Sequence, residues 1–245
     1  MPKYNLGNIL FLDIETVSGV RNYAELPDKI KALWDIKAKQ IYRNKEMPTI
    51  EETYTDNAGF YAEFGRIVCI SVGLLLWSET DNLYHIRLKS FSSKDEKQLL
   101  EDFKQLLLDN PRFSRMCGHN IKEFDIPVIC RRMLLNYIQL PPILDINDKK
   151  PWETGMLDTM LLWRFGAFKN YASLNLLTTL FDVPTPKDDI DGSEVGRVFW
   201  EEDDLDRISI YCEKDVVAVA QLLLKFERLP LVQPEHIFSA YQKSN

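Results

Sequence analysis

The sequence predicts an α/β fold in which helices flank a mixed sheet. Short apolar segments typical of strands occur together with longer segments that repeat apolar residues at helical spacing. The 245 residues contain no internal repeat or low-complexity linker, so we expect a single domain over residues 1–245. Hydrophobic residues make up 45% and charged residues 27% of the chain. This balance is that of a globular protein and excludes collagen-like, disordered and membrane classes.

The first half of the chain contains three expected strands. The first covers residues 9–15 (ILFLDIE), and an apolar segment at 66–77 predicts the second. A polar turn at 79–82 joins it to an alternating segment at 83–91, which predicts an antiparallel hairpin. Residues 20–60, between the first two strands, are more charged and have helical periodicity. They are therefore expected to form a helical insertion.

The second half is expected to be mostly helical. Ser93 can cap the first helix of this part, and Ser173 a later one. The acidic stretch 201–206 suits the solvated start of the last helix, because negative charge stabilises a helix N-terminus. The expected elements are a strand at 114–119, helices at 94–110, 125–138, 157–163, 174–181 and 205–227, and a C-terminal tail over 230–245.

Charge and cysteine content limit the possible functions. The chain has 30 basic and 37 acidic residues, a net charge of −7. It therefore does not bind nucleic acid through bulk positive charge, although a local basic track remains possible. The four cysteines form no C-x-x-C pair, which argues against a structural zinc site or a disulfide scaffold. The N-terminus lacks the pattern of a signal peptide, and no apolar stretch has membrane-spanning length. We expect a cytoplasmic protein without a membrane partner.

Two carboxylates in the first strand are the first candidate site. Asp13 and Glu15 are two residues apart, so they share one face of the strand, and Leu12 and Ile14 point to the other. Ionised carboxylates in so apolar a segment need a compensating partner, for which a cation is suitable. The alternative is a strand end with solvated acids.

The segment GHNIKEFDIP (118–127) is the second candidate site. It places a turn between a strand and a helix, with Asp125 at the expected helix start. Asp125 is then an N-cap, Asn120 a turn residue and Phe124 a core residue. A carboxylate at a helix start can also bind a metal ion, so both interpretations stay open.

The last long helix carries the third candidate pair. Tyr211 and Asp215 are four residues apart, so they share a helix face, and nearby Ile208 and Val219 indicate that this face points inward. The alternative is a core tyrosine with an aspartate at its margin.

Together these three sites resemble the exonuclease motifs of the DEDD superfamily, in its tyrosine-bearing branch. They are most similar to those of the proofreading domain of family-B DNA polymerases and of its stand-alone relatives. The resemblance covers roughly residues 9–227 and implies a ribonuclease H-like fold. The motifs are Asp13-x-Glu15, Asn120-x-x-x-Phe124-Asp125 and Tyr211-x-x-x-Asp215.

The resemblance implies a metal-dependent 3′–5′ exonuclease that hydrolyses phosphodiester bonds from the 3′ end of single-stranded DNA. Two ions, magnesium or manganese, about 3.5–4 Å apart would act on the attacking water and the leaving oxygen. Tyr211 would orient the attacking water or help to deprotonate it. The metal ligands would be Asp13, Glu15, Asp125 and Asp215, and the residues beside the substrate Thr16, Asn120 and Phe124.

Two alternatives stay open: an exoribonuclease, and a non-catalytic nucleic-acid-binding module on the same fold. Basic residues interleaved with aromatics form a candidate nucleic-acid track, although an amphipathic surface helix is the favoured interpretation. The three histidines, His85, His119 and His236, have no metal-ligand spacing. The candidate track consists of Lys37, Lys39, Arg43, Lys45, Arg131, Arg132 and Lys169, with Trp34, Tyr42, Phe168 and Tyr171.

Overall fold

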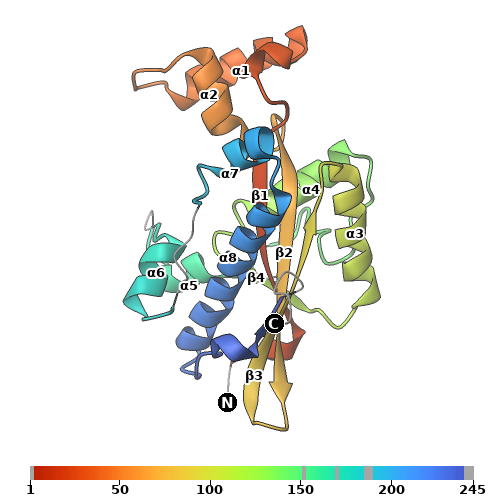
Figure 1. Ribbon diagram of the computed structural model, residues 1–245, viewed down its shortest axis with the longest axis vertical. Helices are drawn as coiled ribbons and strands as arrows, with labels where there is room; N and C mark the ends of the chain where they lie inside the picture. The colour runs from red at the N-terminus through yellow and green to blue at the C-terminus, as the bar shows by residue number, and fades with distance from the viewer. Residues whose placement is uncertain (1–2, 151–152, 169–170, 185–189, 240–245) are drawn as a thin grey trace.

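The computed structural model describes residues 3–150, 153–168, 171–184 and 190–239. Its six-stranded sheet has the order β5-β4-β1-β2-β3-β6 (Figure 1). β1 pairs with β2 and β2 with β3 in antiparallel fashion, and the other neighbours are parallel. This confirms the predicted mixed sheet and its hairpin. The strands are β1 (Ile9–Ser18), β2 (Gly65–Ser78), β3 (Leu83–Ser92), β4 (Arg115–Gly118), β5 (Met156–Asp158) and β6 (Ile237–Phe238).

Helices cover both faces of the sheet (Figure 1). Leu10 and Leu12 of β1 pack under α3 and α4, and Phe11 packs under α8 on the opposite face. Among the described helices, none has the length and apolar character that a membrane span requires. The helices are α1 (Asp28–Ile41), α2 (Ile50–Asn57), α3 (Glu96–Asp109), α4 (Asp125–Leu135), α5 (Thr159–Arg164), α6 (Leu174–Leu180), α7 (Val195–Arg197) and α8 (Leu205–Phe226), with short helical turns η1 (Leu6–Asn8), η2 (Tyr23–Glu25), η3 (Ala58–Phe60), η4 (Val198–Glu202) and η5 (Pro234–His236).

The segment between β1 and β2 has a small core of its own. The fully buried Trp34 of α1 packs edge-on against Tyr54, with ring centroids 5.2 Å apart, and against Phe64 at 5.0 Å. Because Trp34 is buried, it cannot stack on a nucleic-acid base. The candidate nucleic-acid track therefore loses its central aromatic residue, while α1 presents its charged side chains on the surface of an amphipathic helix.

Two helix starts differ from the prediction because side-chain caps decide them. Asp95, not Ser93, caps α3: its carboxylate accepts a hydrogen bond from Gln98 N at 3.1 Å. The helix expected at 157–163 begins only at Thr159, because Asp158 caps it and residues Met156–Asp158 form β5.

The C-terminal segment packs against the domain over its described part, unlike the tail we expected. The side chain of Gln221 bonds both backbone groups of Val232, at 2.6 and 3.0 Å. Ile237 then pairs with Ile86, which adds β6 to the sheet beside β3. Residues 240–245 of the expected tail lie outside the described residues.

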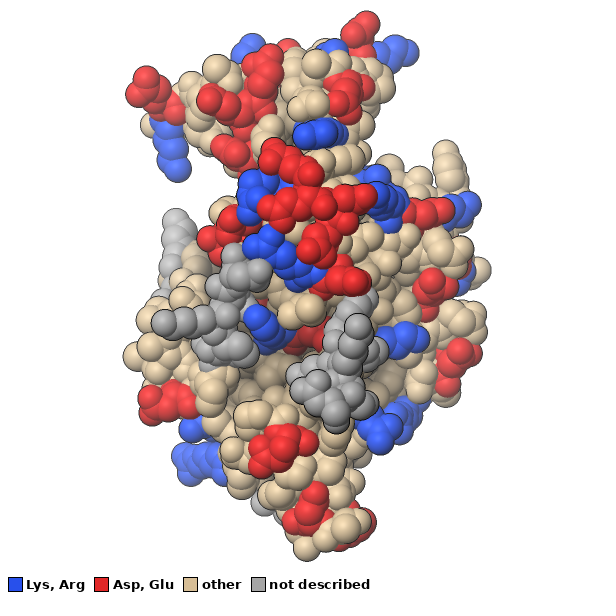
Figure 2. Space-filling view, viewed as in Figure 1, with Lys and Arg blue, Asp and Glu red and all other residues tan. Residues whose placement is uncertain are grey.

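Acidic side chains gather over α7 and the start of α8, interleaved with basic ones (Figure 2). The stretch 201–206 opens α8 as expected, since Asp204 caps the helix by accepting from Arg207 N at 3.0 Å. Glu202 pairs with Arg207 at 2.5 Å, and Asp203 pairs with Lys94 at 2.5 Å. Ion pairs thus compensate much of this acidic surface.

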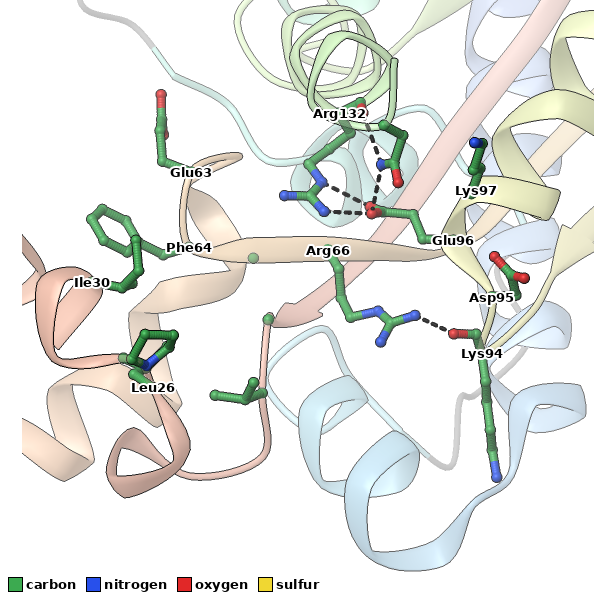
Figure 3. Close-up of a pocket in the computed structure, with 15 residues that line it drawn as sticks. Leu26, Ile30, Glu63, Phe64, Arg66, Lys94, Asp95, Glu96, Lys97 and Arg132 are labelled. Atoms are coloured by element: carbon green, nitrogen blue, oxygen red, sulfur yellow. Dashed lines mark hydrogen bonds and ion pairs between the residues drawn. The ribbon is translucent and has the colours of Figure 1, made fainter. Parts of the chain in front are cut away.

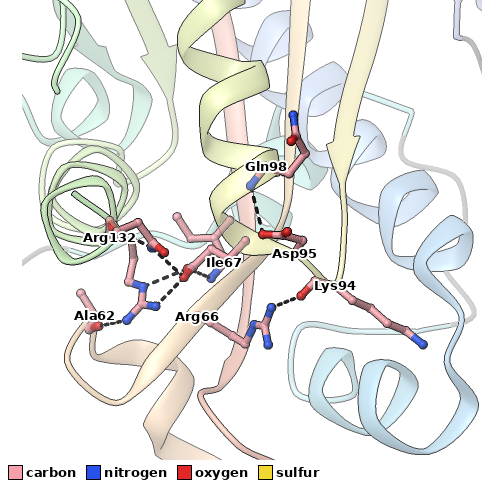
Figure 4. A network of polar contacts seen from close by, with 9 residues as sticks. Ala62, Arg66, Ile67, Lys94, Asp95, Gln98 and Arg132 are labelled. Carbon is pink, nitrogen blue, oxygen red and sulfur yellow. Dashed lines mark hydrogen bonds and ion pairs between the residues drawn. The ribbon is translucent and has the colours of Figure 1, made fainter. Parts of the chain in front are cut away.

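A polar junction fixes α4 against α3 and β2 (Figures 3 and 4). It borders a cavity of about 570 Å³ between the insertion and the sheet. The buried Glu96 accepts hydrogen bonds from the Arg132 guanidinium, from Asn136 Nδ2 at 3.0 Å and from Ile67 N at 2.7 Å. Arg132 also donates to Ala62 O at 2.9 Å. Arg132 therefore stabilises the position of α4, which argues against its place in the candidate nucleic-acid track.

Candidate active site

The four acids named by the sequence meet where β1, α4 and α8 converge. Glu15 and Asp125 are buried, and Asp13 and Asp215 are half-buried. Burial, followed by the charges of Asp125 and Asp215, raises the pKa of Asp13 well above its usual range. Burial, followed by Asp13 and Asp215, likewise raises the pKa of Glu15. The structure therefore brings all four carboxylates within reach of mutual repulsion.

Asp125 is tied directly to the acidic strand. It is the first residue of α4, and Phe124 holds the N-cap position, so the expected capping role of Asp125 was wrong. Burial raises the pKa of Asp125 to about 7, although its own N–H and that of Ile14 donate hydrogen bonds that oppose the rise. Since Ile14 lies between Asp13 and Glu15, this bond places Asp125 beside both.

The loop before α4 has a shape that few residues permit. A Cβ on Gly118 would lie 2.8 Å from Ile121 Cβ and 2.9 Å from Leu12 O, so only glycine fits there. Asn120 follows with a positive φ of 63°. The Asn120 Oδ1 atom is buried and has no hydrogen-bond partner among the described residues. A buried amide oxygen without a partner calls for an explanation, for which a bound ligand or ion is suitable.

Asp158 fixes this loop through hydrogen bonds to its backbone. Its buried carboxylate accepts from Asn120 N at 3.1 Å and from Lys122 N at 3.2 Å, while also capping α5. His119 adds contacts to Thr159 Oγ1 at 2.9 Å and to Ala172 O at 2.8 Å. β5 and α5 thereby position the segment that carries Asn120 and Asp125.

Thr16 and Phe124 lie on the rim of the acidic cluster. A β-bulge follows Glu15, and Thr16 Oγ1 donates to Gly59 O at 2.8 Å, which attaches η3 to β1. Phe60 of η3 is 62% exposed, and its ring lies 6.4 Å from that of Phe124. Two aromatic rings from distant parts of the chain therefore lie close together, and one of them directly precedes Asp125.

α8 supplies Tyr211, Cys212 and Asp215. One ligand atom each of Asp13, Glu15 and Cys212 lie within 4.8 Å of one another. A Cβ on Gly73 would lie 2.7 Å from Val216 Cγ1, so this glycine lets α8 approach β2 closely. Glu213 faces away from the cluster and accepts from Ser90 Oγ at 2.9 Å.

Sequence reasoning missed three residues of this site: Asp158, Cys212 and Phe60. An aspartate directly before a helical segment is a cap signal, which was available for Asp158. No sequence signal indicated that Cys212 would contact Asp13 or that Phe60 would lie beside Phe124. These contacts depend on how α8 and the insertion pack against the sheet.

Comparisons with known proteins agree with this architecture. A family model described as "Predicted 3'-5' exonuclease related to the exonuclease domain of PolB" matches residues 60–236. The chain is similar to the solved family B DNA polymerase from the hyperthermophilic archaeon Pyrobaculum calidifontis, with 13% identity and a TM-score of 0.50. That match covers 89% of this chain but only 24% of the polymerase, and it confirms the ribonuclease H-like fold. No curated protein sequence matches the chain.

Proposed function

Because this chain belongs to the family of predicted 3′–5′ exonucleases related to the exonuclease domain of PolB, we propose that it removes nucleotides from the 3′ end of single-stranded DNA with the help of divalent metal ions. The observation that carries the proposal is the convergence of Asp13, Glu15, Asp125 and Asp215 from three separate elements.

The donor set fits magnesium or manganese. Carboxylate oxygens are the ligands that these hard cations prefer. Burial and mutual repulsion raise the pKa of Asp13, Glu15 and Asp125, and a divalent charge would offset both effects. When bound, two such ions lower the pKa of the attacking water and stabilise charge on the leaving oxygen.

Side chains around the acids are proposed to orient the reactants. A tyrosine phenol ordinarily has a pKa of about 10 and is protonated near neutral pH, so Tyr211 is not proposed as a general base. It is suited to holding the attacking water by a hydrogen bond. Asn120, whose Oδ1 has no partner among the described residues, is suited to contact the terminal nucleotide.

The neighbouring aromatic residues Phe60 and Phe124 support a single-stranded substrate. Phe60 and Phe124 can stack on an unpaired base, an interaction that tolerates any base. The net charge of −7 leaves much of the phosphate attraction to the ions and to local basic residues. We favour DNA over RNA because the family is related to a DNA polymerase domain.

A digestion assay tests this function. Single-stranded DNA and RNA, labelled at the 5′ or the 3′ end, are incubated with magnesium, manganese or a chelator. We expect 5′-labelled DNA to shorten stepwise in magnesium or manganese and to stay intact in chelator. Asp13→Asn should abolish shortening, whereas Asp102→Asn, a change on the outer surface of α3, should not.

Three outcomes would contradict the proposal. Shortening in chelator would reject the metal mechanism. Faster shortening of RNA than of DNA would favour the exoribonuclease alternative. Binding of the labelled strand without shortening in any metal would favour a non-catalytic module.

A further inference from the structure

Two histidines and an aspartate meet at the far end of the β2–β3 hairpin. His85 Nε2 lies 2.8 Å from Asp81 Oδ2, and His236 Nδ1 lies 4.0 Å from the same oxygen. One ligand atom of each residue lies within 4.8 Å of the others. We propose that Asp81, His85 and His236 bind one zinc-like transition-metal ion that fastens the C-terminal segment to the hairpin.

Strand pairing brings the two histidines together. Ile86 pairs in parallel with Ile237, so the residues before them, His85 and His236, lie side by side. Their rings stack with centroids 4.5 Å apart and planes 16° apart. Sequence spacing predicted no metal site here, because the two histidines are 151 positions apart in the chain. The β3–β6 pairing supplies the proximity that the sequence spacing lacks.

The turn of the hairpin presents the third ligand. Asp81 Oδ1 accepts a hydrogen bond from Leu83 N at 3.3 Å, which leaves Oδ2 facing both histidines. A carboxylate oriented in this way is typical of prearranged ligands. The side chains of Asp81, His85 and His236 are 33%, 23% and 22% exposed, so an ion can enter and a water can complete its coordination.

The distances between the ligand atoms suit a tetrahedrally coordinated ion once the three side chains move slightly closer together. Metal–nitrogen distances of about 2.0–2.1 Å in zinc sites place neighbouring ligands roughly 3.3 Å apart. The ligand atoms lie within 4.8 Å of one another, so none of their separations has to shrink by more than about 1.5 Å. Two imidazoles with one carboxylate favour zinc and related transition metals over magnesium.

This site is separate from the acidic cluster. Asp13 pairs with Ser71 on β2, whereas His85 pairs with Leu76, five residues further along the same strand. At a rise of about 3.3 Å per residue, the two sites are roughly 17 Å apart. The zinc proposal therefore stands whether or not the chain is a nuclease.

Binding is tested in a variant whose acidic cluster has lost two of its four carboxylates. In an Asp13→Asn/Asp215→Asn background, purified metal-free protein is titrated with zinc in competition with a chromophoric chelator. We expect one ion per chain. Adding His236→Gln or Asp81→Asn should weaken binding roughly 100-fold or more, while Glu79→Gln, an exposed acid of the same turn, should leave it unchanged. Absence of binding, or binding unaffected by His236→Gln, would overturn the proposal.

A second measurement tests the fastening role. In the same background, zinc should raise the melting temperature and slow proteolytic removal of the C-terminal segment, and His236→Gln should cancel both effects. In the otherwise wild-type chain, His236→Gln should leave magnesium-dependent DNA shortening unchanged. Zinc binding without protection of the C-terminal segment would reject the fastening role.

Discussion

The thiol of Cys212 lies 3.4 Å from Oδ2 of Asp13 and 3.4 Å from its backbone oxygen. The thiol donates to the carboxylate, and this hydrogen bond lowers the pKa of Asp13 against the larger effects of burial and of the neighbouring acids. α8 thus adjusts the chemistry of β1 through Cys212, which occupies an unspecified position between Tyr211 and Asp215 of the third motif.

Replacing the thiol is expected to weaken metal binding. Cys212→Ala removes a hydrogen-bond donor to the charged form of Asp13, so the proton competes better with the cation. The apparent magnesium affinity at neutral pH should fall roughly 2–10-fold, the equivalent of one ordinary hydrogen bond. Cys212→Ser should restore most of it. Cys130→Ala, which removes a thiol bonded to Leu144 O, is the control, and equal affinities for Cys212→Ala and wild type would contradict the expectation.

Stability of the metal-free protein should fall as pH rises. The Asp125 pKa is about 7 in the folded protein and about 3.9 when unfolded, so between these values the folded state holds the proton more tightly. Asp125 then makes the free energy of unfolding decrease with pH, by at most about 1.4 kcal/mol per unit. Urea denaturation at several pH values measures this. Asp125→Asn should flatten the slope, and a slope unchanged by this variant would contradict the assigned cause.

Magnesium should stabilise the folded chain. Ions bind the deprotonated acids of the native state only, so a concentration of 100 times the dissociation constant contributes about 2.7 kcal/mol. For a chain of this size, the melting temperature should rise by roughly 5–10 °C. Differential scanning fluorimetry with magnesium, and then with excess chelator, measures the change. The proposed site would be rejected if Asp13→Asn and wild type responded equally.

Tyr211→Phe should slow turnover without preventing metal binding. The change removes one hydroxyl and keeps the ring, so only the proposed hydrogen bond to the attacking water is lost. We expect kcat to decrease on the order of 10–100-fold, with little change in the metal concentration for half-maximal rate. Single-turnover rates over a magnesium titration separate the two quantities. A shift in metal dependence at unchanged kcat would instead indicate a role in holding the ions.

Arg132→Ala should destabilise the fold. It leaves the buried Glu96 without its ion-pair partner, and breaking such a pair from one side costs about 3–5 kcal/mol. The denaturation midpoint in urea should fall accordingly. Arg131, its exposed neighbour, provides the matched control, and Arg131→Ala should change stability by less than about 0.5 kcal/mol. Similar losses for both variants would show that the junction contributes little.

Periodicity and turn chemistry were sufficient to predict much of the sheet. Apolar patterning placed β1, β2 and β3 correctly, because each of these strands is long enough to show an apolar run or an alternating pattern in the sequence. The three-residue β5 and two-residue β6 leave almost none. The start of α3 was misplaced at Ser93. The choice between Ser93 and Asp95 as the cap depends on where the preceding strand β3 ends.

The acidic cluster was predicted from spacing and resemblance, and the roles of its residues stay predictions. Two acids on one strand face follow from the alternation of β1. The contributions of Asp158, Cys212 and Phe60 could not be predicted, since each acts across elements that are distant in the sequence. The same is true of His85 and His236, whose proximity depends on the register of β6.

The added strand β6 also bears on self-association. Without it, Ile86 and Arg87 would keep their partners on β2 but lose those on β6, and the outer edge of β3 would lose this cover near the exposed Trp77 and Leu83. Unprotected sheet margins are templates for strands of other molecules. A chain shortened before Leu231 is therefore expected to oligomerise, even if its catalytic centre remained intact.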